Sequence, residues 1–444
     1  MYLKTFDYIG TLASAQRGVA AKDRDETRLL LKNGLVIDPK NGISEVCDIR
    51  TAGGEIVQVE SGLAPEAGEC VLDCEGLMVW PGLIDMHLHL GDLFEVSTAP
   101  ITCAVQDGVT FGLSPGAGNT FMAPALLGAE VDRGLPLNLG VYLGAANVLA
   151  TQLTQDELIK LFLGTLDAET ASRKLTRNPV TNTTAALTIG IKDHMGHFIM
   201  PDESIERIFD LTKRANLVYM SHTQDPEHAE RMAALSRGRA LHLAHATAAG
   251  CGTHGSAEEG MERVLGLVGG AITAEFVSSM LRPNRGRREG ARMSKRAQQL
   301  AYDALHAGKV RILVSDGQSQ AVMKGFGDTR DDIPAILELA EMEVLTIEQA
   351  VASMTSAPAE LLAQRTANDW WTRRTGNLGV GALANITVVD RKDKSAVYTI
   401  VNGEIASFEG RAVRRNGGAG GWVSKFGMHR RTGVGDLSLY TDND

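Results

Sequence analysis

Residues 79–91 read VWPGLIDMHLHLG, an apolar run that ends in two histidines separated by one residue. Side chains two positions apart on a strand point to the same side, so His87 and His89 face one point where the run ends. Neutral imidazole is a common ligand of transition metals. The stretch therefore predicts a buried strand whose carboxyl end carries part of a metal site.

Downstream of this stretch, short β-rich runs alternate with helical patterns over roughly 280 residues. This pattern favours an α/β fold of the (β/α)8 TIM barrel type, with a doubly wound open sheet as the competitor. Four polar residues end apolar runs in this region: Lys192, His222, His245 and Asp316. His222 lies 30 residues after Lys192 and 23 before His245. Such spacing is close to a βα unit of about 30 residues and supports the barrel, whose strand ends converge.

The two chain ends have a different texture from the centre. Residues 28–80 and 370–410 contain short strands with turns between them, and we predict that together they form a small β-sandwich. The barrel would then occupy residues 81–369, preceded by an N-terminal segment at 1–27. The tail at 411–444 is rich in Gly and Arg and could be disordered, an oligomer arm or a lid over a neighbour's site.

Composition restricts the functional class. Of 444 residues, 44% are hydrophobic and 22% charged, which is ordinary for a soluble globular enzyme. Lys and Arg total 44 against 54 Asp and Glu, so the net charge of −10 gives no general attraction to nucleic acid. Five cysteines without a C-x-x-C pair argue against a disulfide framework. Because no apolar run is long enough for a membrane span or a signal peptide, we expect a cytoplasmic protein without a membrane partner.

Several motifs together identify a family resemblance. They are VWPGLIDMHLHLG, GIKDHMG, SHTQD, LAHATAAG, LVSDG, MTSAPAELL and GNLGVGALANITVVD. With them, residues 28–410 resemble the amidohydrolase superfamily of metal-dependent hydrolases. The resemblance is to the branch that contains dihydroorotases, hydantoinases, allantoinases and related deacetylases and imidases.

The resemblance implies a site with two divalent metal ions, zinc or manganese. Six residues fill its ligand positions: His87, His89, Lys192, His222, His245 and Asp316. The first two histidines and Asp316 would hold the more buried metal, and the other two histidines the second. Lys192, carboxylated on its nitrogen by CO2, would bridge the two. From the residues alone, a salt bridge between Lys192 and Asp193 is the alternative.

The resemblance also implies a reaction. A metal-bridged hydroxide would attack the carbon–nitrogen amide bond of a cyclic amide, a cyclic imide or an N-acyl compound, with Asp316 as proton shuttle. The alternatives are a deaminase of a nitrogenous ring in the same fold and a catalytically silent structural homologue. Family members are often homodimers or homotetramers, and we expect a small-molecule substrate as the partner.

Substrate contacts are predicted from two regions at the barrel mouth. His194 and His197 follow Lys192 on an expected loop, where they could orient the substrate. Six arginines lie between residues 282 and 296, of which Arg282 and Arg285 are our candidates. Arginine pairs bidentately with carboxylate, so this basic segment predicts an anionic substrate, although a solvated loop and helix is the default.

Two features leave details of the site open. Dihydroorotases usually carry an arginine just after the paired histidines, whereas Gly91 and Asp92 follow here. Dihydroorotate is therefore disfavoured, and the context leans towards the deacetylase or D-aminoacylase-like side of the branch. His242 lies three residues before His245, hence on the opposite face of a strand, and is either a structural residue or the actual ligand in place of His245.

Overall fold

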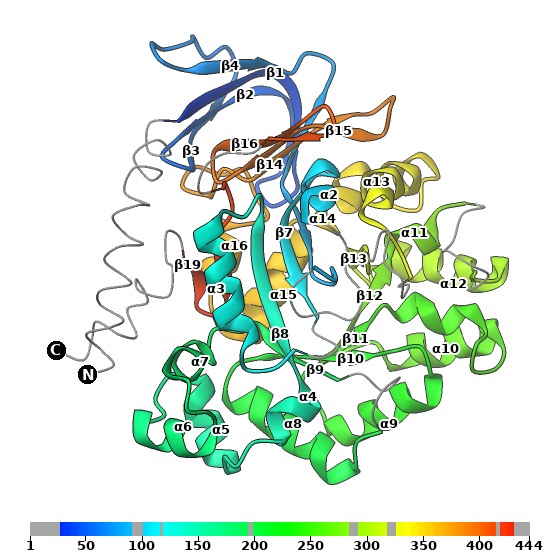
Figure 1. Cartoon of the computed structure of the whole chain (residues 1–444). Coiled ribbons are helices and arrows are strands. Elements are labelled where there is room, and N and C mark those ends of the chain that lie inside the picture. Colours follow the sequence, from blue (N-terminus) through cyan, green and yellow to red (C-terminus); the bar gives the residue numbers. More distant parts are fainter. Residues whose placement is uncertain are drawn as a thin grey trace.

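The computed structural model describes residues 27–90, 101–115, 119–193, 199–283, 292–317, 326–413 and 418–429. Figure 1 shows a barrel of strands and helices with a separate sheet against one side of it. No helix within these residues is both long and apolar enough to cross a membrane.

The barrel wall consists of eight strands that each pair in parallel with the next one along the chain. They are β6 (Leu83–Asp85), β7 (Val109–Ser114), β8 (Asn138–Gly144), β9 (Gly190–Asp193), β10 (Val218–His222), β11 (Leu241–Ala244), β12 (Ile272–Val277) and β13 (Ile312–Val314). A parallel bridge between Leu88 and Gly317 brings the first and last strands together. The predicted (β/α)8 barrel is confirmed, and the open sheet is excluded.

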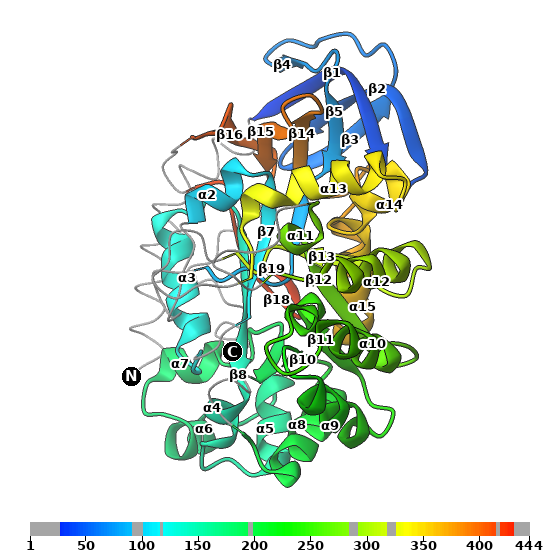
Figure 2. The same cartoon turned by 90° about the vertical axis from the view of Figure 1, so that its right-hand side faces the viewer.

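Helices between the strands cover the outside of the barrel (Figure 2). They are α2 (Ile101–Gln106), α3 (Ala123–Arg133), α4 (Ala145–Leu149), α5 (Gln155–Phe162), α6 (Ala168–Lys174), α7 (Pro179–Thr184), α8 (Asp202–Arg214), α9 (Pro226–Ser236), η1 (Ala246–Cys251), α10 (Ala257–Leu267), α11 (Ser278–Leu281), α12 (Lys295–His306), η2 (Thr329–Asp331), α13 (Asp332–Glu341), α14 (Ile347–Ala352), α15 (Ser356–Thr366) and α16 (Trp370–Arg374).

Helix α8 shows why these segments are helical and face the strands. Its first turn holds Asp202 and Glu203 and its last turn Lys213 and Arg214, so the charges oppose the helix dipole at both ends. Its apolar residues recur every three or four positions and are buried against the barrel. The helix therefore closes one βα unit between β9 and β10, the strands that carry Lys192 and His222.

Strand β9 lies unusually close to β10 because it begins with a glycine. A Cβ added at Gly190 would lie 2.2 Å from the carbonyl oxygen of Val218 on β10. Larger residues at this position would push the two strands apart. The glycine therefore allows the close approach that sets Lys192 beside Met220 in the ladder, two residues before His222.

A second sheet combines both ends of the chain. Its strands are β1 (Arg28–Asp38), β2 (Ile43–Ala52), β3 (Glu55–Glu60), β4 (Cys70–Asp73), β5 (Met78–Pro81), β14 (Ile386–Asp390), β15 (Ser395–Val401), β16 (Glu404–Phe408) and β17 (Arg411–Ala412). Strand β5 joins the two halves, since it pairs with β1 on one side and β14 on the other. Ladder bonds make one continuous sheet from both chain ends, and its two halves share one apolar core, in agreement with the predicted domain built from both ends.

Part of the C-terminal tail has a definite place in the barrel. Strands β18 (Trp422–Ser424) and β19 (Gly427–His429) form a hairpin, and β18 pairs with β8 at Leu139. Trp422 is fully buried, and the backbone N–H of Lys425 donates to Thr188, just before β9. The hairpin therefore fills the wall between the starts of β8 and β9, a role that none of the predictions for the tail included.

Candidate metal centre

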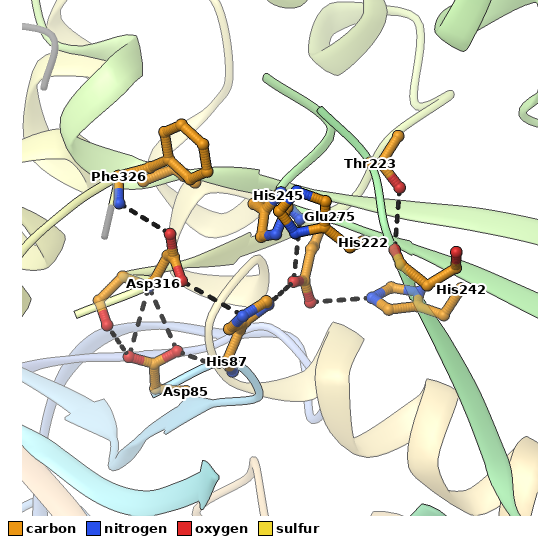
Figure 3. A network of polar contacts seen from close by, with 12 residues as sticks. Asp85, His87, His222, Thr223, His242, His245, Glu275, Asp316 and Phe326 are labelled. Atoms are coloured by element: carbon orange, nitrogen blue, oxygen red, sulfur yellow. Dashed lines mark hydrogen bonds and ion pairs between the residues drawn. The ribbon is translucent and has the colours of Figure 1, made fainter. Parts of the chain in front are cut away.

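The carboxyl ends of the barrel strands bring the six predicted ligands into one region, and Figure 3 shows four of them, His87, His222, His245 and Asp316. The histidine pair follows β6, Lys192 lies in β9, His222 ends β10, His245 follows β11 and Asp316 follows β13. All except His222 are buried, and the lysine side chain is only 1% exposed. In a (β/α)8 barrel this end of the strands carries the chemistry.

The tightest part of the region consists of His87, His89 and Asp316. Nε2 of His87 lies 3.2 Å from Oδ1 of Asp316, and Nε2 of His89 lies 3.1 Å from the same oxygen. One ligand atom from each residue lies within 4.8 Å of the others, as a metal site requires. The three side chains come from the first and last barrel strands, which the sequence places about 230 residues apart.

The other histidines adjoin this group through ring contacts. The ring centroid of His245 lies 5.0 Å from that of His87 and 4.5 Å from that of His222. Lys192 is close enough to affect the titration of both His87 and His222. The structure thus gathers the side chains expected around two metals into one contiguous cluster.

Electrostatics keep the candidate ligands in their metal-binding forms. Burial lowers the pKa of His87, and burial followed by the charge of Lys192 lowers the pKa of His222 to about 3. Burial alone would raise the pKa of Asp316, but His87 and His89 outweigh it and hold that pKa below its usual range. At neutral pH the imidazoles of His87 and His222 are therefore uncharged and the carboxylate of Asp316 is ionised, which suits a divalent cation.

Three buried carboxylates hold the backbone of candidate ligands in place. The backbone N–H groups of three histidines each donate to one of them at 3.1 Å. The pairs are His87 with Asp85, His222 with Asp193, and His245 with Glu275. Asp85 also accepts bonds from the backbone and hydroxyl of Ser315, so it ties β6 to the residue before Asp316.

Glu275 on β12 was not predicted from the sequence. Its Oε1 lies 2.5 Å from Nδ1 of His87, and its Oε2 lies 2.9 Å from Nε2 of His242. These two histidines hold the pKa of Glu275 well below its usual range, although its burial opposes them. The only signal in the sequence is an acidic residue inside the apolar run GAITAEFV.

His242 has partners on both ring nitrogens. Besides Glu275, its Nδ1 lies 2.9 Å from Oγ1 of Thr273. The side chain is buried beneath the site. These contacts match the structural role among the two that the sequence left open for His242.

Two candidate ligands adopt an unusual backbone conformation. His245 has φ 37° and Asp316 has φ 46°, both in the left-handed region that favours glycine. Asp316 is held there by its Oδ2, which accepts the backbone N–H of Phe326 at 2.8 Å. The ring of Phe326 lies 5.1 Å from that of His245 and covers it. The chain thus turns sharply at two strand ends where side chains must point into the site.

The predicted substrate contacts are placed only in part. His194, His197 and Arg285, like Gly91 and Asp92, lie outside the described residues. Arg282 is buried, and its guanidinium donates to Glu338 at 2.9 and 2.8 Å and to Asp331. These bonds occupy the guanidinium with carboxylates of the protein itself. The structure therefore gives Arg282 a structural ion pair where a substrate contact was predicted.

Comparison with known proteins identifies the class. Residues 78–406 match the amidohydrolase family, so the chain belongs to that family, as the motifs predicted. A dihydroorotase of Geobacter sp. (strain M21) is 23% identical over 451 residues, covering 85% of this chain and 98% of that protein. A dihydroorotase of Geobacter sulfurreducens is 56% identical over 64 residues, which span only 15% of its length.

Solved structures show the same fold. A D-hydantoinase matches with a TM-score of 0.65 and 17% identity, covering 90% of this chain and 100% of that one. An L-hydantoinase from Arthrobacter aurescens matches with a TM-score of 0.63 and 17% identity, covering 89% and 99%. At this identity the likeness concerns the fold, and the activity must be argued from the site.

Proposed function

We propose that the protein hydrolyses a carbon–nitrogen bond in a small cyclic amide or imide. The observation that carries the proposal is the convergence of His87, His89 and Asp316, in which Nε2 of each histidine lies 3.1 to 3.2 Å from Oδ1 of Asp316. Because Nδ1 of His87 donates to Glu275, its Nε2 presents a lone pair to a carboxylate oxygen. A divalent cation held by these residues would satisfy that lone pair.

The donor set fits two divalent ions, zinc or manganese. His87, His89 and Asp316 would hold one, and His222 and His245 the other, with Lys192 between them. Such ions lower the pKa of water and polarise a carbonyl. Carboxylation of Lys192 by CO2 would replace a buried ammonium, which disfavours nearby cations, with an anion that attracts them.

The residues of the chain would then divide the remaining work. Asp316 is ionised and lies at the centre of the cluster, so it can take a proton from the attacking water and deliver it to the leaving nitrogen. An amide nitrogen leaves poorly unless it is protonated, so this transfer is essential. Phe326, whose ring lies 5.1 Å from that of His245, would shield this side of the cluster from bulk water.

A hydrolysis screen tests the proposal. Protein loaded with zinc or manganese would be offered dihydroorotate, hydantoins, cyclic imides, lactams and N-acyl amino acids. We expect turnover of at least one cyclic compound, and none by the His87→Asn, His89→Asn double variant. The names of the relatives favour cyclic substrates, whereas the motif after the paired histidines disfavours dihydroorotate. No turnover by a fully metal-loaded protein, or release of ammonia from a ring, would contradict the proposal.

We also propose that the protein is a homodimer or homotetramer that acts in the cytoplasm. The support is the family resemblance and the cysteine usage alone. Light scattering after gel filtration would measure the mass in solution, and a mass of one chain would contradict the oligomer.

A further inference from the structure

One carboxylate touches three histidines of the barrel. Oε1 of Glu275 lies 2.5 Å from Nδ1 of His87 and accepts the backbone N–H of His245 at 3.1 Å, and Oε2 lies 2.9 Å from Nε2 of His242. Glu275 and the imidazoles of His87 and His242 are completely buried. Figure 3 shows Glu275 between these side chains, with His242 on the side away from Asp316.

The contacts define which ring nitrogen of His87 carries the proton. A neutral imidazole has one donor and one acceptor nitrogen. Oε1 already accepts from a backbone N–H, so it acts as an acceptor towards Nδ1 of His87 as well. The proton of His87 is therefore on Nδ1, and the lone pair of Nε2 faces Asp316 and His89.

The same reasoning extends to His242. Its Nε2 donates to Oε2 of Glu275, so its Nδ1 must accept from the hydroxyl of Thr273, 2.9 Å away. That hydroxyl in turn lies 3.4 Å from Nη2 of Arg365 on α15, which can only donate. A directed series of hydrogen bonds thus runs from Arg365 on α15 to Glu275, which also accepts from His87.

We propose that Glu275 is a positioning residue that fixes the metal-binding tautomer of His87 and, through the backbone of His245, couples the two halves of the metal centre. This inference rests on the proposed function for the presence of metal. Outer-shell carboxylates commonly orient metal-bound histidines, and their loss typically lowers metal affinity by about 10- to 100-fold. Asp85 and Asp193 differ from Glu275 in this respect, because they contact His87 and His222 only through the backbone N–H.

The variant Glu275→Gln gives a specific test. Because the backbone N–H of His245 needs an acceptor, the amide oxygen should occupy the place of Oε1, and the amide nitrogen should face His242. His87 would keep its proton on Nδ1. His242 would move its proton from Nε2 to Nδ1 and donate to Thr273, whose hydroxyl can turn to the carbonyl of Leu241.

Nitrogen-15 NMR of histidine-labelled, metal-free protein reads these tautomers directly, with signals assigned by single substitutions. The proposal predicts Nδ1–H on His87 in both proteins and a change at His242 in the variant alone. A proton on Nε2 of His87 in the wild type, or an unchanged His242 in the variant, would overturn it.

Zinc affinity gives an independent readout. Glu275→Leu removes the acceptor, and we expect the zinc Kd, measured by competition with a chromophoric chelator, to rise about 10- to 100-fold. Glu275→Gln should change it less than tenfold, and Glu338→Gln, a control that removes a partly buried carboxylate charge beside Arg282, should leave it unchanged. A folded Glu275→Leu protein with wild-type affinity would overturn the proposal.

These outcomes are separable from the proposed function. If Glu275→Leu does not fold, the NMR result for Glu275→Gln decides alone. If the tautomers follow the prediction but no substrate is hydrolysed, only the proposed function fails. If hydrolysis occurs while the tautomers do not follow, only the role of Glu275 fails.

Discussion

Two clusters of charged side chains, one around Arg282 and one around Asp316, differ in how their atoms face one another. Around Arg282, the donors of one guanidinium meet the oxygens of Asp331 and Glu338, so every close contact joins opposite charges. Around Asp316, Nε2 of His89 can donate to Oδ1, whereas the lone pair on Nε2 of His87 meets the same acceptor oxygen. The first cluster is complete with the protein's own atoms, whereas the second leaves Nε2 of His87 without a donor among the described residues, which a cation would satisfy. Burial and charge alone do not distinguish a site from a structural ion pair, but the donor and acceptor roles do.

The largest expected effect is on turnover, and it tests the Asp316 cluster. Asp316→Asn keeps the shape of the side chain but removes the base, so kcat should fall by about 10²- to 10⁴-fold. Steady-state rates on the substrate found by the screen would measure this. The variant should still bind zinc, as measured by elemental analysis. An unchanged kcat would remove Asp316 from the mechanism and weaken the contrast between the clusters.

A pH effect is expected beside the Arg282 cluster. Burial, and then the charge of Asp328, raise the pKa of Asp107 from 3.8 to about 7. The folded protein therefore binds this proton more tightly than the unfolded chain, and stability falls as pH rises from about 4 to 7. At 1.36 kcal/mol per unit the loss is at most about 4 kcal/mol.

Urea unfolding at several pH values would show the effect of Asp107. The variant Asp107→Asn keeps the acceptor for the hydroxyl of Thr329. Its free energy of unfolding should not show this fall between pH 4 and 7. The variant should also be more stable than the wild type at pH 8. If the free energy of unfolding falls equally with pH in both proteins, Asp107 is ionised in the folded protein and the prediction is wrong.

Zinc should stabilise the protein through the cluster around Asp316 and not through the cluster around Arg282. Zinc at 100 times its Kd should raise the free energy of unfolding of metal-free protein by about 2.7 kcal/mol. Thermal unfolding with and without zinc would measure the gain. The His87→Asn, His89→Asn variant should lose most of it, whereas an Arg282 variant should keep it all. Equal stabilisation of all three proteins would place the zinc elsewhere.

The smallest expected effect concerns Arg282. It decides whether this residue forms a structural ion pair or contacts the substrate. Arg282→Met should lower the free energy of unfolding by about 2 kcal/mol, between the values for exposed and fully buried pairs. Its KM should equal that of the wild type, because the guanidinium is already bound by carboxylates. A rise in KM without loss of stability would restore the predicted substrate contact.

Much of the fold and of the candidate site could be predicted because both depend on local patterns. Apolar runs that end in a polar residue indicate barrel strands, and the spacing of Lys192, His222 and His245 gives their order. The convergence of His87 with Asp316 follows from the closure of the barrel. These predictions needed only the period of a strand and the length of a βα unit.

The remainder depends on contacts that no local pattern contains. Glu275 and Arg282 are both charged residues at or after β12, yet one lies against the site and the other against α13. Their difference is set by neighbours that are distant in sequence. The hairpin at Trp422 likewise enters the barrel wall through pairing with Leu139, almost 300 residues earlier. Sequence periodicity gives the direction of a side chain but not its partner.

The left-handed backbone at His245 and Asp316 has a consequence for engineering. Holding a residue other than glycine in this conformation costs roughly 1 to 2 kcal/mol. Glycine at either position would relieve that strain while removing a side chain of the metal centre. Libraries selected for stability alone should therefore enrich for inactive proteins at these two positions, and a selection for thermostable catalysts must screen for activity at the same time.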